Sequence, residues 1–280
     1  MIKIISDSTS DLSAELKERY DISILPLNVH LGDQNFLDGV NITPQEIFAW
    51  SDANNTTPKT SAVSVEVAVE LFNRFPDDDL ICFAISEDMS STANAMRLAA
   101  DEIGRSDRIH IVNCQNLSTG SGLLIVEAAE MVKQGKGVEE ILAKLDELIP
   151  KVRASFVVDT LTYLHRGGRC SSVAALAGGV LHLHPKIVVE SGKMHATKKY
   201  RGKMKSVLLS YVKDMENDLK NARKEHVFIT HTYCDEAVVA DIRAYLESLG
   251  VFSEIHETYA GGVVSSHCGP GTLGVLFIEG

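Results

Sequence analysis

Short apolar runs alternate with helical patterns in the first half of this chain, and this alternation constrains the fold more than any other feature. Apolar runs at residues 2–5, 80–85 and 109–112 are each followed by a polar turn and then by a helical pattern. Strands that alternate with helices are typical of an α/β layer fold with a largely parallel sheet. We therefore expect the N-terminal half to form a mostly parallel sheet with flanking helices.

Several helices in this half carry clear start signals. Thr43-Pro44-Gln45-Glu46 combines an N-cap residue, a proline suited to the first turn and an acidic residue that completes a capping box. Ser64 can cap the next helix. Apolar residues recur on one face between positions 138 and 148, which predicts an amphipathic helix there.

The pattern changes after Pro150. Strand-like runs at 186–190 and 194–198 flank Ser191-Gly192-Lys193, which is typical of a hairpin turn. Longer helical patterns, near 204–219 and 236–249, lie between further strand candidates. This half is therefore expected to be a mixed sheet backed by helices.

We place the domain boundary near residue 152. An N-terminal α/β domain would span residues 1–152 and a C-terminal α/β domain residues 153–280. No low-complexity linker separates the two halves. Their junction is therefore the natural place for a ligand.

Charge and composition exclude several classes of protein. The net charge of −11 argues against a nucleic-acid-binding protein, which needs a basic stripe to displace counterions. No apolar run approaches the roughly 18 residues that a membrane-spanning helix needs. The first residues lead straight into a strand and lack the pattern of a signal peptide. We expect a cytoplasmic protein without stable membrane insertion.

Cysteine and histidine spacing does not indicate a metal site. The five cysteines are scattered and form no CxxC pair, so neither a disulfide framework nor a structural zinc site is expected. His182 and His184 lack an acidic or sulfur partner nearby in sequence, and His226 and His231 do not form a metal set.

Hydroxyl side chains gather at four turns. These turns lie at residues 6–11, 56–61, 86–92 and 116–122. Ligands of open α/β sheets sit at the carboxyl ends of the strands, where helix N-termini offer unpaired N–H groups to an anion. Each cluster alone is also what helix capping requires. Four clusters on one expected edge indicate a site for a small anionic or polar head group.

Motifs for nucleotide or nucleophile chemistry are missing. The chain has neither a GxxxxGK[ST] loop nor a GxGxxG after a strand. Ser121 lies between two glycines but does not fit the GxSxG nucleophile elbow. These absences argue against an enzyme that uses a nucleotide.

Two glycine-rich segments in the second half hold further candidates. Gly167-Gly168-Arg169 turns the backbone sharply at a helix end, and Arg169 either forms an internal salt bridge or reaches an anion. The segment His267-Cys268-Gly269-Pro270-Gly271 fixes a turn. On such a rigid turn His267 could donate to a carboxylate or phosphate; a structural role is the alternative.

Taken in order, these segments resemble the DegV family of bacterial proteins. The matching motifs are Asp-Ser-Thr-Ser-Asp-Leu, Thr-Pro-Lys-Thr-Ser, Ile-Ser…Met-Ser-Ser-Thr, Leu-Thr-Tyr-Leu…Gly-Gly-Arg, Lys-Tyr-Arg and His-Cys-Gly-Pro-Gly, at residues 7–12, 57–61, 85–92, 161–169, 199–201 and 267–271. The resemblance covers essentially the whole chain. Family members commonly have Thr-Ser-Gln-Pro at residues 60–63 and Ser-Gly-Thr-Tyr at residues 90–93, where this chain has Thr-Ser-Ala-Val and Ser-Ser-Thr-Ala.

The resemblance implies two α/β domains that hold a fatty acid between and within them, with no other cofactor. Hydroxyls of Thr60 and Ser90 would bind the carboxylate, and the acyl chain would run into the C-terminal domain. The protein would be a carrier rather than an enzyme, and would present the carboxylate to a separate ATP-using fatty acid kinase. The implied ligand-binding residues are Thr60, Ser61, Ser90, Ser91, Arg201, His267 and Gly269.

Elementary energetics are compatible with a lipid carrier. Burial of about 15 methylenes at about 0.8 kcal/mol each supplies roughly 12 kcal/mol before immobilisation costs. The apolar segments at 173–183 and 187–189, the first rich in Ala and Gly, are candidates for a tunnel lining. Two alternatives stay open: a lipid hydrolase that uses Ser90 and His267 with Asp88 or Asp7 as orienting acid, and a binder or sensor of another amphiphile.

Overall fold

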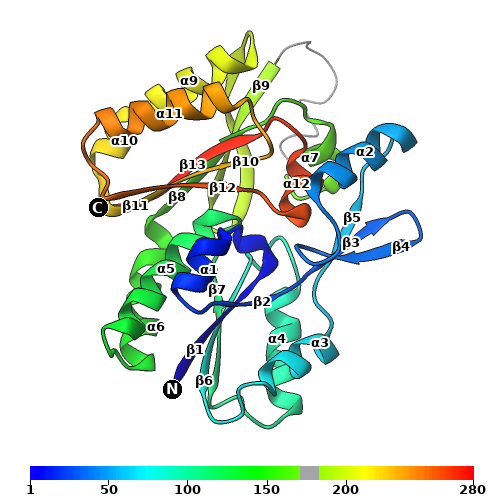
Figure 1. Cartoon of the computed structure of the whole chain (residues 1–280), viewed down its shortest axis with the longest axis vertical. Helices are drawn as coiled ribbons and strands as arrows, with labels where there is room; N and C mark the ends of the chain where they lie inside the picture. The colour runs from blue at the N-terminus through cyan, green and yellow to red at the C-terminus, as the bar shows by residue number, and fades with distance from the viewer. Residues whose placement is uncertain (171–182) are drawn as a thin grey trace.

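The computed structural model describes residues 1–170 and 183–280, whose strands form three sheets (Figure 1). The first sheet has four parallel strands in the order β2-β1-β6-β7. Its strands are β1 (Ile2–Asp7), β2 (Ser23–Leu25), β6 (Asp79–Ala84) and β7 (Ile109–Asn113). The expected parallel sheet of the N-terminal half is thus confirmed.

Two helices of the first half begin where the sequence signals predict, at the caps Thr43 and Ser64. The Thr43 capping box is formed, because the Thr43 hydroxyl accepts from the N–H of Glu46 and the Glu46 carboxylate accepts from the N–H of Thr43. The helical elements are the 3-10 turn η1 (Ser8–Ser10), α1 (Ala14–Arg19), α2 (Pro44–Asn54), α3 (Val65–Phe72), α4 (Thr92–Glu102), α5 (Thr119–Lys133), α6 (Val138–Leu148) and the 3-10 turn η2 (Ile149–Lys151).

The second sheet has six strands in the order β10-β9-β8-β13-β11-β12, and only the β11–β12 pair is parallel. The strands are β8 (Val152–Val157), β9 (Leu183–Glu190), β10 (Lys193–Arg201), β11 (Ala222–His231), β12 (Glu254–Tyr259) and β13 (Leu273–Glu279). The expected hairpin joins β9 to β10 through Ser191 and Gly192, both with positive φ. This mixed sheet confirms the fold class.

Helices of the second half lie mainly on one face of the six-stranded sheet (Figure 1). The helices α9 and α11 pack on that face through a separate apolar cluster that includes Val207, Tyr211 and Ile242. The helices of this half are α7 (Thr162–Gly167), α9 (Met204–Asp214), α10 (Glu216–Lys220), α11 (Glu236–Ser248) and α12 (Gly262–Cys268).

A small third sheet was not predicted. It is antiparallel, in the order β4-β3-β5, and consists of β3 (Asn28–Leu31), β4 (Gln34–Leu37) and β5 (Lys59–Ser61). Thr60 lies on β5, opposite Val29. The expectation that four hydroxyl clusters share one sheet edge was therefore wrong, because one of them belongs to this sheet.

The two large sheets share one apolar core. Helix α5 packs on β1 and β6 of the first sheet and on β8, β11 and β13 of the second. Buried residues of both sheets, such as Phe83 and Phe156, join the same cluster around Leu124 of α5. Helix α12 belongs to the second half of the chain but packs on α2, β3 and β5 of the first half. None of the helices in residues 1–170 and 183–280 is long and apolar enough to cross a membrane.

Candidate ligand-binding site

Helix α12 carries His267 on its last turn, and two carboxylates from the first half hold its other end. The N–H of Gly261 donates to Asp11 at 2.8 Å, and the N–H of Gly262 donates to Asp38 at 2.6 Å. A Cβ atom at Gly262 would lie 2.9 Å from the Asp38 carboxylate, so glycine is needed for this approach. The sequence placed His267 on the Gly-Pro-Gly turn; the structure corrects this to a helix that ends just before that turn.

The carboxylates at the start of α12 are buried. Asp11 accepts a second hydrogen bond from the Ser118 hydroxyl at 2.5 Å, and Asp38 accepts one from Ser8 at 2.8 Å. Burial raises the pKa of Asp11 to about 8, although the hydrogen bonds from Ser118 and Gly261 lower it. Burial also raises the pKa of Asp38. The anchor of α12 is therefore sensitive to pH.

We predict that Asp11 makes stability fall as pH rises. Because burial raises its pKa from 3.8 to about 8, the folded state binds a proton that the unfolded chain releases in this range. The stabilisation is complete below the unfolded pKa and is lost as pH rises through the folded pKa. This group should lower the free energy of unfolding by up to about 1.4 kcal/mol per pH unit in that window. Denaturant unfolding should show that Asp11→Asn removes this slope; an unchanged slope would contradict the assignment.

The His267 ring is fixed on two sides. Its Nε2 lies 2.8 Å from the Thr60 hydroxyl, whereas its buried Nδ1 has no hydrogen-bond partner among the described residues. Gly167 packs against this nitrogen so closely that a Cβ there would lie 2.3 Å from it. The two glycine-rich segments of the second half therefore meet at this ring.

These contacts determine the charge and the tautomer of the His267 ring. Burial, with a smaller effect of the Arg169 charge, lowers the pKa of His267 to about 4, so the ring is neutral near pH 7. A buried N–H without an acceptor is costly, so we assign the proton to Nε2, which donates it to Thr60. The Thr60 hydroxyl then keeps its own proton for an incoming anion.

An outer pocket lies beside this pair. Its polar lining comes from β5, the turn before α4, the turn after α7 and α12. Apolar side chains such as Met89, Met194 and Val263 complete the wall. The polar members are Thr60, Ser61, Ser90, Arg169 and His267. The outer pocket thus joins hydroxyl donors to one cation in a largely apolar surround.

A second pocket, called here the inner pocket, lies next to the outer one. The two pockets share Leu117, Val264 and Cys268 as lining residues. The deeper walls include Phe156 and Leu276 of the second sheet. The shared residues place the inner pocket beside α12, on the face of the second sheet that α5 covers.

Threonine hydroxyls in the inner pocket are already engaged. The Thr230 hydroxyl bonds those of Thr119 and Thr258, and the hydroxyls of Thr232 and Thr272 donate to the backbone carbonyls of Gly269 and Cys268. With their polar atoms satisfied, these side chains leave the pocket suited to apolar groups. An outer polar end and an inner apolar end are what an amphiphile with an anionic head requires.

Comparison with known proteins identifies the family. A family model described as an uncharacterised protein of the DegV family matches residues 1–280. The chain belongs to the DegV family. A DegV domain-containing protein from Caldanaerobacter subterraneus subsp. tengcongensis is 31% identical over 283 residues, which cover 99% of each chain.

Solved DegV structures are similar over the whole chain. The structure reported as fatty acid binding of a DegV family protein from Thermus thermophilus has a TM-score of 0.90 and 30% identity, over 99% of each chain. The stearic-acid-binding protein from Eubacterium ventriosum has a TM-score of 0.86 and 29% identity, over 100% of this chain and 98% of the other. These relatives are described as binding fatty acids.

In this DegV protein, four of the seven expected site residues line the outer pocket: Thr60, Ser61, Ser90 and His267. The other three do not. Ser91 is exposed at the N-cap of α4. Gly269 packs on the Tyr163 ring so closely that a Cβ at this position would lie 2.6 Å from a ring carbon. Arg201 ends β10 opposite Leu183, whereas Met194 lies opposite Val189, so Arg201 lies roughly 20 Å farther along the sheet.

Arg169 is the site residue whose role the sequence left undecided. It lines the outer pocket and forms no ion pair among the described residues. Its guanidinium instead donates to the backbone carbonyls of Gly167 at 2.7 Å and Met89 at 3.5 Å. The charge of Arg169 is therefore available to an anion. The Gly-Gly-Arg turn was the sequence feature that indicated this residue.

The structure does not assemble the hydrolase alternative. The Ser90 hydroxyl bonds Thr92 at 2.9 Å, while His267 bonds Thr60. Neither suggested acid reaches the free nitrogen of His267. Asp88 pairs with Lys193 at 3.5 Å, and Asp7 accepts from Thr9 and from the N–H of Ile85. Without an oriented base, Ser90 has no activation as a nucleophile.

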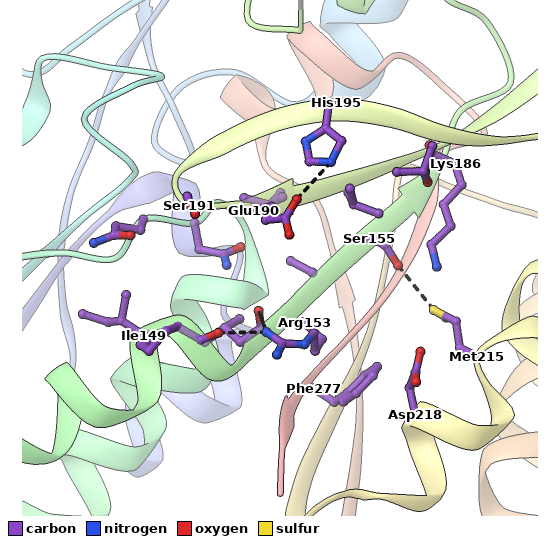
Figure 2. A pocket seen from close by; sticks show the side chains of 18 residues that line it. Ile149, Arg153, Ser155, Lys186, Glu190, Ser191, His195, Met215, Asp218 and Phe277 are labelled. Carbon is purple, nitrogen blue, oxygen red and sulfur yellow. Dashed lines mark hydrogen bonds and ion pairs between the residues drawn. The ribbon is translucent and has the colours of Figure 1, made fainter. Parts of the chain in front are cut away.

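A larger groove lies over β8, β9 and β10 (Figure 2). None of the expected site residues lines it. Figure 2 shows charged groups along it, including Lys186, Asp218 and the Glu190–His195 ion pair at 3.3 Å. The groove therefore mixes charged groups with apolar side chains such as Val188 and Phe277.

Part of the expected tunnel lining lies outside the described residues. Residues 171–182 include nearly all of the 173–183 segment, together with His182. In the other expected segment, Val189 lines the inner pocket and Ile187 is buried in the shared core.

Proposed function

We propose that this protein binds a single long-chain fatty acid, with its carboxylate in the outer pocket and its acyl chain in the inner pocket. The observation that carries the proposal is that a pocket with hydroxyl donors and a largely apolar pocket lie side by side, with Leu117, Val264 and Cys268 lining both. The fatty acids bound by the relatives from Thermus thermophilus and Eubacterium ventriosum support it.

The carboxylate would be stabilised by hydroxyl donors and one cation. Thr60 would donate the proton that its hydrogen bond to His267 leaves free, and Ser90 and Arg169 face the same space. Burial of an unpaired carboxylate costs several kcal/mol, so these donors are needed for binding. No further cofactor is part of the proposal.

The two halves of the chain would bind different parts of the fatty acid. Residues 1–152 would supply the head-group hydroxyls, because Thr60, Ser61 and Ser90 all come from this half. Residues 153–280 would house most of the acyl chain, because most residues that line the inner pocket come from the second half.

The carrier would act in the cytoplasm and present the carboxylate to a separate ATP-using fatty acid kinase. Transfer of the γ-phosphoryl group of ATP to a carboxylate oxygen gives an acyl phosphate and ADP. The chain has no phosphate-binding loop of its own, so a partner must bring the nucleotide. Arg169 is exposed beside the pocket, where its charge can also meet a phosphorylated head group.

Native mass spectrometry of the purified protein, with extraction of its lipid, tests the binding step. We expect one fatty acid per chain. Recovery of a different amphiphile, or of none after incubation with fatty acids, would reject the proposal. For the second step, ATP and a bacterial fatty acid kinase are added, and acyl phosphate is trapped by hydroxylamine as the hydroxamate. Binding without hydroxamate would restrict the function to carriage.

We predict that Gly167→Ala weakens fatty acid binding by about 10-fold or more, because the added methyl forces His267 away from Thr60 and the Thr60 hydroxyl loses the hydrogen bond that orients it toward the carboxylate. Displacement of a fluorescent fatty acid from delipidated protein measures the change. Gly137→Ala is the matched control, since nothing lies within 4 Å of a Cβ there. Equal affinities in both variants would argue against the His267–Thr60 arrangement.

A further inference from the structure

Three potential metal ligands project from β11 and β12 on the face that α5 covers, four residues along β11 from Thr230 of the inner pocket. His226 pairs with Glu254 in the parallel ladder, and His256 is two residues beyond Glu254. Because side chains alternate along a strand, all three point to the same face. In the part of the chain that the structure describes, this is the only group of three or more His, Cys, Asp or Glu residues whose ligand atoms lie within 4.8 Å of one another.

The distances suit a small metal ion. His226 Nδ1 lies 3.1 Å from His256 Nε2, and this nitrogen lies 3.7 Å from Glu254 Oε2. Two zinc–nitrogen bonds of about 2.0–2.1 Å at a tetrahedral angle separate their nitrogens by about 3.4 Å. Shifts of a few tenths of an ångström would therefore bring the three atoms into ligand positions.

A carboxylate behind His226 sets the direction of its lone pair. His226 Nε2 lies 3.2 Å from Glu130 of α5, which also accepts from the Tyr20 hydroxyl at 2.9 Å. A carboxylate only accepts, so the His226 proton belongs on Nε2 and the Nδ1 lone pair faces His256. Histidines that bind zinc are oriented by carboxylates in this way. The Phe228 ring stacks on His256 at 4.7 Å and holds the second imidazole.

We propose that His226, His256 and Glu254 bind one first-row divalent transition-metal ion such as Zn²⁺, with water as the fourth ligand. Two imidazole donors suit this class and not Mg²⁺ or Ca²⁺, which take oxygen ligands. His226 is buried, while Glu254 is about one-third exposed, which gives the ion a path from solvent. Through Glu130, the ion would tie the edge of the second sheet to α5.

Arg19 competes with the ion for Glu254. Its guanidinium binds both carboxylate oxygens, at 2.8 Å and 3.0 Å. The ion must take Oε2 from Arg19 and remain near a positive charge, which opposes binding. The proposal therefore makes a directional claim: Arg19→Gln should bind the metal more tightly than the natural chain.

Isothermal titration of tag-free protein with ZnCl₂ tests the site. We expect one Zn²⁺ per chain, at least 10-fold weaker binding in His256→Gln, about 10-fold weaker binding in Glu130→Gln and tighter binding in Arg19→Gln. His195→Gln is the matched control, because His195 also lies beside a carboxylate, Glu190 at 3.3 Å, and should leave affinity unchanged. Circular dichroism of the metal-free variants checks that each is folded.

Three results would overturn the assignment. The first is that the natural chain binds no Zn²⁺ in the micromolar range. The second is that His256→Gln binds as tightly as the natural chain, or that His195→Gln loses as much affinity. The third comes from Co²⁺ substitution: a thiolate charge-transfer band would place the ion on a cysteine. Failure of these tests leaves the fatty acid proposal untouched, because the two sites share no residue.

Discussion

Val264→Phe should shorten the fatty acids that this protein binds. Val264 lines both pockets, so a phenyl ring there would block the path that the proposal gives the acyl chain from one to the other. Loss of about four buried methylenes, at about 0.8 kcal/mol each, predicts at least about 100-fold weaker binding of long-chain acids. Acids short enough to end in the outer pocket should keep most of their affinity. Displacement assays on delipidated protein across a series of chain lengths measure the change.

The dependence on chain length separates a blocked passage from general damage. An overpacked core would weaken every acid alike, whereas a blocked passage weakens only those that reach the inner pocket. Val40→Phe adds the same ring at a position that is 67% exposed and should change nothing. Equal losses at all chain lengths, or none, would show that the inner pocket does not hold the tail.

Features set by neighbouring residues could be predicted from the sequence. The capping box at Thr43 and the Ser191-Gly192 hairpin depend on chemistry within a few positions, and both are formed. The parallel sheet followed from apolar runs that are buried in the structure. Such signals are local, so no long-range contact is needed to interpret them.

Helix α12 and the third sheet depend on distant residues and were missed. Gly262, two β-branched valines and two serines disfavour a helix at 262–268, but Asp11 and Asp38, more than 200 positions away, bind the N–H groups at its start. Strand β5 is only Lys-Thr-Ser, with no apolar signal, and forms by pairing with β3. Local propensity could not specify either element.

The motifs predicted some residues of the site but not where each lies relative to the ligand. Thr60 and His267 were both expected near the head group, and the structure brings them together across 207 positions. Arg201 was expected there too, but a motif does not tell which end of a strand faces the ligand, and β10 carries Arg201 away. Arg169, left undecided between a salt bridge and an anion, lines the pocket instead.

Thr60→Val should weaken fatty acid binding by about 100-fold. The change keeps the shape of the side chain but removes one hydrogen bond to the carboxylate, worth about 1.5–3 kcal/mol, and leaves the His267 Nε2–H without its acceptor. Thr56→Val, at an exposed position before β5, is the matched control and should bind normally.

The affinity for the fatty alcohol of equal length shows whether the effect acts through the head group. If Thr60 donates to a carboxylate, Thr60→Val should weaken binding of the acid much more than binding of the alcohol, because the alcohol carries no charge. Equal losses for the two ligands would mean that the hydroxyl only supports local packing. In that case the anion would have to rely on Ser90 and Arg169, the other donors that line the outer pocket.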